Sequence, residues 1–373
     1  MKIVLFCHSL VSDWNHGNAH FLRGVVTELM ALGHAVDVYE PADGWSVRHL
    51  VAAEGSDAIA AFEQAYPRLE SRRYILEDLD LDRVLEHADL VLVHEWNTPD
   101  LVERIGRHAA GGRCRLLFHD THHRSVTKPD EIAAFDLSRY DGVLAFGDAI
   151  RDRYLEKGWA ARAWTWHEAA DARVFRPPET APLHEGDLVW IGNWGDGERK
   201  RELVEFLLEP AAELGLRARV YGVRYPDHAQ RALAEADVEY AGWLPNFRVP
   251  AVFARYRTTV HVPRQVYSGA LTGVPTIRMF EALACGIPLV SAPWEDSEGL
   301  FRTGVDFLVA HDGKEMQQKL RELLEDPERA AEQARNGRET ILRRHTCAHR
   351  ARELLAIVEE LGTTPHAQEI MHG

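Results

Sequence analysis

Short apolar runs alternate with longer amphipathic stretches along most of the chain. Ile3 to Cys7 and Ala35 to Tyr39 are apolar runs typical of buried strands, and residues 17–32 between them have the period of a helix that stops at Gly33. A strand, a helix and a strand within about forty residues form a βαβ unit, whose strands pair in parallel. The pattern therefore predicts an α/β protein of the doubly wound class.

The same alternation continues through two halves of the chain. Further strands are expected at 90–94, 115–119, 142–146 and 162–165, and then at 188–192, 217–221, 258–262 and 287–291. Helices are expected at 46–65, 79–87, 99–109 and 148–157, and then at 198–214, 227–236, 249–255, 313–324, 327–343 and 347–361. Residues 167–186 contain several prolines and lose the helical period, which indicates a linker. We expect domains at 1–175 and 176–345, followed by a last helix and tail at 346–373.

Composition narrows the class of protein. The 373 residues are 46% hydrophobic and 27% charged, which suits two globular domains. The net charge of -15 argues against a protein that binds nucleic acid through phosphate contacts, and an anionic ligand would need a local group of basic residues. The four widely spaced cysteines form no metal-type pair, and no run is long enough for a signal peptide or a membrane span. We expect reduced thiols and a cytoplasmic location.

One helix carries the most informative pattern, residues 275–291, P-T-I-R-M-F-E-A-L-A-C-G-I-P-L-V-S. Thr276 is expected to cap its start, and Gly286 to end it in a left-handed conformation. Arg278 and Glu281 lie three residues apart on one side of the helix. They either pair on a solvated face, or they serve an anion and the paired hydroxyls of a sugar at a helix start.

Ligands of doubly wound sheets bind beyond the carboxyl ends of the strands, which selects the loops that follow them. The loop after the first strand, H8-S-L-V-S-D-W-N-H-G-N-A-H, offers Asp13 and His16. His16 and His20 are four residues apart and could ligate a metal, but no third ligand is marked. The alternative is that these polar residues cap and pack the next helix.

The loop F118-H-D-T-H-H-R-S-V offers a second group. His119 suits a base near neutral pH, and Asp120 could orient a histidine or act as the base itself. A metal cluster with His122 and His123, or a histidine-rich loop that is only structural, are the alternatives.

The loop I191-G-N-W-G-D-G-E-R-K-R combines glycines with positive charge. Gly192 allows close approach of the backbone, and Arg199 and Lys200 can hold phosphate oxygens. The alternative is a solvated first turn of a helix, at an energetic cost, because cations there oppose the helix dipole. No G-x-G-x-x-G, G-x-x-x-x-G-K-[ST] or G-x-S-x-G motif occurs, which disfavours a classical dinucleotide enzyme, a P-loop NTPase and an α/β-hydrolase.

The segment F280-E-A-L-A-C-G-I-P-L-V-S closely resembles the nucleotide-binding helix of GT-B glycosyltransferases, and D171-A-R-V-F-R-P resembles their interdomain crossover. Arg278 and the tail E339-T-I-L-R-R-H-T-C-A-H-R-A-R-E-L-L look most like the group typified by the spore maturation protein CgeB. The resemblance implies two Rossmann-like domains that face each other across a cleft, with the last helix packing back on the first domain. It also implies a glycosyltransferase that uses a nucleotide-diphosphate sugar.

 The enzyme would be of the hexosyl type, although the donor sugar and its base stay open, and no metal or other cofactor is expected.

The resemblance also assigns roles to single residues. Glu281 would bind the ribose hydroxyls and be partly exposed, and Arg199, or next Lys200, would neutralise the departing diphosphate. His119 would contact the donor sugar, with Asp120, Asp13 and His16 as further candidates on the first domain.

The remaining candidates follow the later strands of the second half. The backbone of Y240-A-G-W-L-P-N-F would meet the base, with Trp243 or Leu244 beside it, although core packing is an equal alternative for Trp243. Arg264, Tyr267, Ser268 and Thr276 belong to a glycine-containing loop that could close over the diphosphate.

One departure from the family pattern leaves the stereochemical outcome open. Many retaining GT-B enzymes carry a second glutamate eight residues before the ribose glutamate, and that position is Gly273 here. The acceptor is a small molecule, a glycan or a protein, and no nucleic acid or membrane partner is expected. The alternatives are a sugar-nucleotide epimerase, a catalytically silent nucleotide-sugar-binding protein and a periplasmic-type binding protein.

Overall fold

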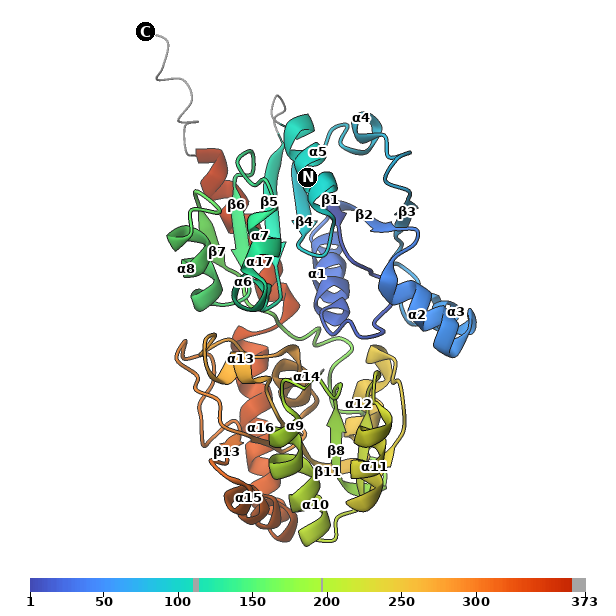
Figure 1. Ribbon diagram of the computed structural model, residues 1–373, viewed down its shortest axis with the longest axis vertical. Coiled ribbons are helices and arrows are strands. Elements are labelled where there is room, and N and C mark those ends of the chain that lie inside the picture. Colours follow the sequence, from blue (N-terminus) through green and yellow to red (C-terminus); the bar gives the residue numbers. More distant parts are fainter. Residues whose placement is uncertain (110–113, 196, 364–373) are drawn as a thin grey trace.

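The computed structural model describes residues 1–109, 114–195 and 197–363, and two parallel sheets organise this part of the chain. The first sheet has the strand order β3-β2-β1-β4-β5-β6-β7 and the second β10-β9-β8-β11-β12-β13. They form the upper and lower domains in Figure 1. In both sheets the chain starts in the middle, runs to one edge and then crosses to the other side. The strand order therefore reverses between β1 and β4 and between β8 and β11, and ligands of such sheets bind at these switch points.

The elements of the first domain have the following bounds. The strands are β1 Lys2–Phe6, β2 Ala35–Pro41, β3 Arg72–Tyr74, β4 Leu90–His94, β5 Arg115–Asp120, β6 Gly142–Ala145 and β7 Ala163–Thr165. The helices are α1 Ala19–Ala31, α2 Trp45–Glu54, α3 Asp57–Ala65, α4 Leu81–Val84, α5 Pro99–Ala109, α6 Arg124–Thr127, α7 Pro129–Ala133 and α8 Asp148–Glu156.

The second domain and the last helix follow. The strands are β8 Gly186–Ile191, β9 Ala218–Tyr221, β10 Val238–Tyr240, β11 Tyr256–His261, β12 Leu289–Ser291 and β13 Leu308–Val309. The helices are α9 Lys200–Leu203, the π-helix η1 Val204–Leu208, α10 Glu209–Glu213, α11 Asp227–Glu235, the 3-10 helix η2 Asn246–Arg248, α12 Val249–Phe253, α13 Gln265–Ser268, α14 Ile277–Cys285, α15 Gly313–Glu325, α16 Pro327–Arg344 and α17 Cys347–Thr363.

The central strands are continuous apolar runs because helices cover both faces of each sheet. Every residue of β4 is buried, and so are the four residues of β6. The strand at 90–94 and the helix at 99–109 match their predicted bounds, and Gly286 ends α14 with φ 68°, which confirms its left-handed conformation.

Two predicted helices are interrupted in the structure, and three short strands were not predicted. The single helix expected at 46–65 is two helices, because Gly55 takes φ 79° and turns the chain between α2 and α3. The single helix expected at 198–214 contains the π-helical segment η1 between α9 and α10. The short strands β3, β10 and β13 were not predicted, because two or three residues are too few to show a period.

The cap expected from Thr276 is also wrong. Its side chain accepts no hydrogen bond from the first turn of α14, and its Oγ1 lies 3.1 Å from His261 Nε2 instead. The N–H of Ile277 is hydrogen-bonded to the carboxyl group of Glu168, which belongs to the segment between β7 and β8. We call this segment, residues 166–185, the crossover. A distant side chain therefore replaces the local cap.

The last helix leaves the second domain and lies against the first, as Figure 1 shows. α17 packs on α1, and Cys347 lies so close to Gly24 that a Cβ at Gly24 would be 2.4 Å from its Sγ. Trp166 of the crossover donates its Nε1–H to the carbonyl of Arg350 at 2.9 Å. The exact boundaries of the domains stay a prediction, and residues 364–373 of the expected tail lie outside the described residues.

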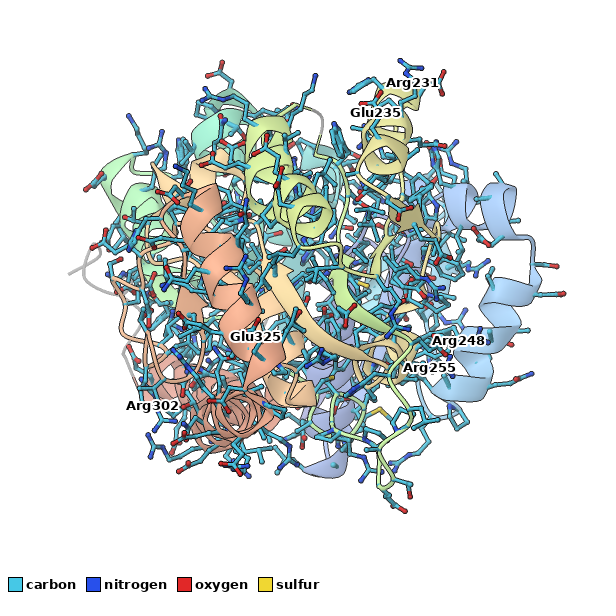
Figure 2. The ribbon with its side chains drawn as sticks, turned by 90° about the horizontal axis from the view of Figure 1, so that it is seen from below. Arg231, Glu235, Arg248, Arg255, Arg302 and Glu325 are labelled. Atoms are coloured by element: carbon cyan, nitrogen blue, oxygen red, sulfur yellow. The ribbon has the colours of Figure 1, made fainter. Side chains whose placement is uncertain are left out.

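The outer end of the second domain is a solvated surface of mixed charge. Figure 2 views this end and shows Arg231 and Glu235 of α11 extending outward, with Glu325 at the end of α15. Among the described residues, no helix is both long enough and apolar enough to cross a membrane.

Candidate functional site

The switch points of the two sheets face each other. Asn15 follows β1 and Asn193 follows β8, and the side-chain amide of Asn193 donates a hydrogen bond to Asn15 Oδ1. We call the contacts between these two ends the interdomain seam. Its hydrogen bonds join Asp13, Asn15 and His20 of the first domain to Asn193, Trp243, Asn246 and Glu281 of the second. At these positions side-chain contacts fill the cleft that we expected between the domains.

Arg199 lies at the second switch point and ties its two loops together. Its Nη1–H donates to the carbonyl of Val262 at 3.0 Å, after β11, and its Nη2–H to the carbonyl of Asn193 at 2.5 Å, after β8. The guanidinium carbon lies 5.1 Å from the centre of the Trp190 ring. The buried Nε has no hydrogen-bond partner among the described residues.

The surroundings of Arg199 are positively charged. Burial, and then the like charges of Arg264 and Arg278, lower the pKa of Arg199 to about 10. Arg264 pairs with Glu198, and Arg278 pairs with Glu281, whereas Arg199 hydrogen-bonds only backbone carbonyls in the described structure. The positive charge of Arg199 therefore has no acidic side chain paired with it among the described residues, and a bound anion would balance it.

Lys200 does not join this group. It is exposed at the start of α9 and lines a hollow of about 820 Å³ on the outer surface, together with Arg201, Glu205 and Lys314. Gly192, by contrast, lies at the switch point, and a Cβ there would meet the Trp190 ring at 2.7 Å. Glycine is therefore required by packing at this position, beside the loop that holds Arg199.

Glu281 is fully buried, so the expectation that it is partly exposed is wrong. His20 and Asn246 each lie 2.9 Å from its Oε1, and Arg278 donates to its Oε2. His20 Nε2 accepts the N–H of Asp171 at 2.8 Å, so Nδ1 must carry the ring proton that is donated to Glu281. Of the three side chains that contact the carboxylate, His20 thus comes from the first domain.

The pKa of Glu281 shows which of these effects is stronger. Burial opposes ionisation, but the charge of Arg278 and the hydrogen bond from His20 outweigh it and hold the pKa of Glu281 below its ordinary value. Arg278 and Glu281 are therefore a pair, as one alternative held, but the carboxylate does not lie on a solvated face.

Asp13 bridges the seam with both carboxylate oxygens. It forms an ion pair with Arg23 at 2.9 Å and accepts hydrogen bonds from Trp243 Nε1–H and from the N–H of Asn246, each at 3.1 Å. Trp243 also packs with Trp14 and its neighbours, and Leu244 packs against the main core. In this structure Asp13, Trp243 and Leu244 hold the domains together.

Four imidazole rings lie in a row that extends from the first switch point into the first domain; we call this row the file of imidazoles. His8 and His16 have ring centres 4.9 Å apart, His16 and His94 6.3 Å, and His94 and His119 5.2 Å. Burial lowers the pKa of His119 to about 3, and neither of its ring nitrogens has a partner among the described residues. His119 is fully buried, and His16 is nearly so, with its Nε2 3.1 Å from the carbonyl of Ser9. His8 is the member of the file that remains partly exposed.

Asp120 belongs to a buried network rather than to an open surface. It accepts hydrogen bonds from the N–H of His122 at 2.9 Å and from the hydroxyl of Tyr154 at 2.8 Å. Burial raises its pKa, and burial together with Asp120 raises the pKa of the neighbouring Glu95. Arg124 opposes the shift of Glu95 through its ion pair.

The loop after β11 contributes only part of what was expected. Tyr267 is buried, with its ring 5.7 Å from that of His123, while Ser268 is exposed and donates to the carbonyl of Gln265 at 3.2 Å. Arg264 is the residue of this loop whose positive charge acts on Arg199 and helps to lower its pKa. Within the described ranges, no three His, Cys, Asp or Glu side chains are grouped so that they could hold a metal ion.

Comparison with known proteins decides the fold. Residues 199–356 match a family model described as glycosyl transferase-like. HepE of Anabaena, solved with UDP and glucose, is 13% identical, with a TM-score of 0.69 over 96% of this chain and 100% of HepE. The chain has the GT-B fold. A glycosyltransferase of Rickettsia africae is 11% identical, with a TM-score of 0.66 over 98% of this chain and 99% of that one. Sucrose-phosphate synthase of Thermosynechococcus elongatus is 13% identical, with a TM-score of 0.65 over 97% and 99%.

The predicted resemblance to GT-B glycosyltransferases is thus confirmed, while the narrower resemblance to the CgeB group stays a prediction. No curated protein matches the sequence. The sites of this GT-B protein therefore rest on its own geometry.

Several residues at the candidate site were not predicted. The sequence indicated His20 only as a possible metal ligand, although it bonds to Glu281, and it indicated no role for Asn246 or Glu168. Glu95, Trp96 and Arg124 surround the end of β4, and the rule that selects loops after strands would have found the first two. Arg124 lies within the loop F118-H-D-T-H-H-R-S-V that the same rule had selected, but no role was assigned to it.

Proposed function

We propose that the chain is a glycosyltransferase that moves a sugar from a nucleotide-diphosphate sugar to an acceptor hydroxyl, without a metal ion, in the cytoplasm. One observation carries the proposal: Arg199 lies at the second switch point with a buried, unpartnered Nε, beside the charges of Arg264 and Arg278. Arg264 and Arg278 already pair with Glu198 and Glu281, so a diphosphate would supply above all the negative charge that Arg199 lacks. Arginine is suited to this role because it binds phosphate oxygens with two N–H groups and stays charged.

The same arrangement suits the chemistry. The bond between the anomeric carbon and the diphosphate oxygen breaks, a bond from the acceptor oxygen to that carbon forms, and the hydroxyl proton passes to a base or to the departing diphosphate. Negative charge grows on the diphosphate as it leaves, and fixed cations that face it lower the barrier. Arg199, Arg264 and Arg278 are our candidates for that role.

Glu281 remains our candidate for the ribose, with a condition that the structure adds. Its Oε1 is occupied by His20 and Asn246, so ribose hydroxyls would have to replace these donors. On the first domain His8 joins His16, His119, Asp120 and Asp13 as a candidate to contact the sugar or the acceptor. His8 is favoured by its partial exposure at the switch point.

A nucleotide screen tests the proposal. Melting temperatures are measured with UDP, GDP, ADP, CMP, dTDP and their sugar conjugates, first in EDTA and then with Mg²⁺. A ligand at about 100 times its dissociation constant adds roughly 2.7 kcal/mol of stability, so one nucleotide should raise the melting temperature clearly in EDTA. UDP is the first choice, because HepE was solved with it.

Two variants make the screen specific. Arg199→Met should weaken nucleotide binding about 10- to 100-fold, the usual value of hydrogen bonds to a charged group. Arg201→Met is the matched control, because Arg201 is exposed two positions further along α9 and lines the outer hollow. If no nucleotide stabilises the wild-type chain, or if both variants bind equally well, the proposal is wrong. Conversion of the donor sugar without any acceptor would instead indicate an epimerase.

A further inference from the structure

Trp96 is the one exposed tryptophan among the ten in the chain, all of which lie in the described ranges. Its side chain is 39% exposed and follows the end of β4. His8 follows β1, the other strand of the first switch point, and the two ring centres are 5.9 Å apart. The pair therefore occupies the position where a sheet of this topology binds a ligand.

Arg124 packs against the Trp96 indole and fixes its position. The guanidinium carbon of Arg124 lies 4.3 Å from the centre of the Trp96 ring. Arg124 is fixed in turn by Glu95, through Nε to Oε2 at 3.0 Å and Nη2 to the backbone carbonyl at 2.5 Å. Glu95 is fully buried and Arg124 is 9% exposed, so little solvent competes with these contacts. A ring that is held before binding loses little conformational freedom when a ligand stacks on it.

Two neutral imidazoles border the indole. His122 lies 5.0 Å from Trp96, ring centre to ring centre, and burial lowers the pKa of both His122 and His8, that of His8 to about 4. A neutral imidazole offers one hydrogen-bond donor and one acceptor. Nδ1 of His122 is buried and has no partner among the described residues, so this ring can meet a ligand only through Nε2. No hydrogen bond joins His122 Nε2 or the ring of His8 to another described residue. Both histidines thus have hydrogen-bonding capacity to spare at neutral pH.

A series of contacts connects the indole to the proposed donor site. The rings of His122 and His123 are 3.9 Å apart, and His123 Nε2 is 4.0 Å from Glu198 Oε2. Glu198 in turn pairs with Arg264, one of the three arginines near the second switch point. A short series of contacts therefore joins Trp96 to the arginines across the domain interface.

We propose that Trp96, His8 and His122 form the acceptor subsite and that the acceptor is a sugar ring, free or part of a glycan. This inference rests on the proposed function. A pyranose has C–H groups on its faces and hydroxyls around its rim, and a flat indole bordered by neutral donors and acceptors matches both. A purely aromatic acceptor would stack on the indole but would leave the two imidazoles without partners.

The test measures sugar binding and nucleotide binding separately. Saturation-transfer NMR titrations use the methyl α- and β-glycosides of glucose, galactose, mannose and N-acetylglucosamine, with benzyl alcohol as an aromatic probe, in the presence of UDP. The variants are Trp96→Leu and His8→Ala. The control is Trp159→Leu, because Trp159 is partly buried after α8 and packs on Tyr154. The dissociation constant of UDP is measured for every variant.

The expected result is a glycoside whose ring protons receive saturation in the wild type and in Trp159→Leu. Its dissociation constant should rise about tenfold or more in Trp96→Leu and several-fold in His8→Ala, with UDP affinity unchanged. Equal glycoside binding in Trp96→Leu with normal UDP binding overturns the inference and leaves the proposed function standing. Binding of benzyl alcohol alone, or of no glycoside, also overturns it. Glycoside binding that depends on Trp96 while no nucleotide binds would show a sugar site, but it overturns both the proposed function and the assignment of that site to an acceptor.

Discussion

Replacement of Glu168 by glutamine should stabilise the protein at neutral pH. Glu168 lies in the crossover between the domains and is 5% exposed. Its Oε1 accepts a hydrogen bond from the side-chain amide of Asn18 at 2.8 Å, and no ion pair with a basic side chain balances its charge in the described structure. Burial is the largest effect and raises the pKa of Glu168 to about 8, and the negative charge of Glu281 acts in the same direction.

The sign and size of the effect follow from proton linkage. At pH 7 the folded protein holds a proton on Glu168, whereas the unfolded chain, with an ordinary pKa near 4.5, does not. The folded state binds more protons, so the contribution of Glu168 to stability is fully present below about pH 4.5 and is lost as the pH rises toward 8. Each pKa unit corresponds to 1.36 kcal/mol, so the loss at pH 7 is about 3 kcal/mol. Glutamine is neutral in both states and should recover much of it.

Urea unfolding at pH 5, 6, 7 and 8 tests this reasoning. The stability of Glu168→Gln relative to the wild type should grow by about 2–3 kcal/mol between pH 5 and pH 7. Glu179→Gln is the matched control for the substitution itself, because Glu179 is exposed in the same crossover. If Glu168→Gln is less stable than the wild type by the same amount at every pH, the carboxyl group is ionised and stabilised in the folded protein, and the argument is wrong.

Two further substitutions test the seam and the returning helix. Glu281→Gln should destabilise the protein by about 2–4 kcal/mol and weaken UDP binding, because one amide oxygen cannot replace the carboxylate that Arg278 and two other donors share; unchanged unfolding and UDP titrations would contradict this. Gly24→Ala should cost about 1–3 kcal/mol, because its Cβ would meet Cys347 Sγ at 2.4 Å. The control Gly362→Ala meets nothing within 4 Å, so it should be neutral or slightly stabilising in a melting experiment, and equal effects of the two would refute the packing of α17 on α1.

The sequence was sufficient for the architecture because each long element shows its own period. The strand at 90–94 and the helix at 99–109 have strong patterns, and both are found at their predicted bounds. Local order was not enough where pairing partners decide the structure, as in β13, which has two residues and exists because β12 lies beside it. The missing side-chain cap at Thr276 has the same origin, since Glu168 from the crossover takes the N–H of Ile277.

The candidate site divides along the same line. Arg199 could be found from sequence because its function depends on its own loop: glycines end β8, and a basic residue follows close behind. The sequence could not show that Arg199 lacks a carboxylate partner, because the neighbouring Glu198 pairs with Arg264 only in the folded structure. Sequence thus indicates which residue could hold an anion, and the fold determines whether its charge is already balanced.

Glu281 shows why the environment of a residue is harder to predict than its role. The helix that carries it was found from its apolar stripe and its terminal glycine, but the carboxylate is buried by His20, which is 261 positions earlier and belongs to the other domain. The ring of His20 stacks on Phe175 at 3.8 Å, and its Nε2 accepts the N–H of Asp171, so the crossover fixes its orientation. One neutral imidazole therefore joins α1, the crossover and α14. No local pattern records such a contact, because it exists only when both domains and the segment between them have folded together.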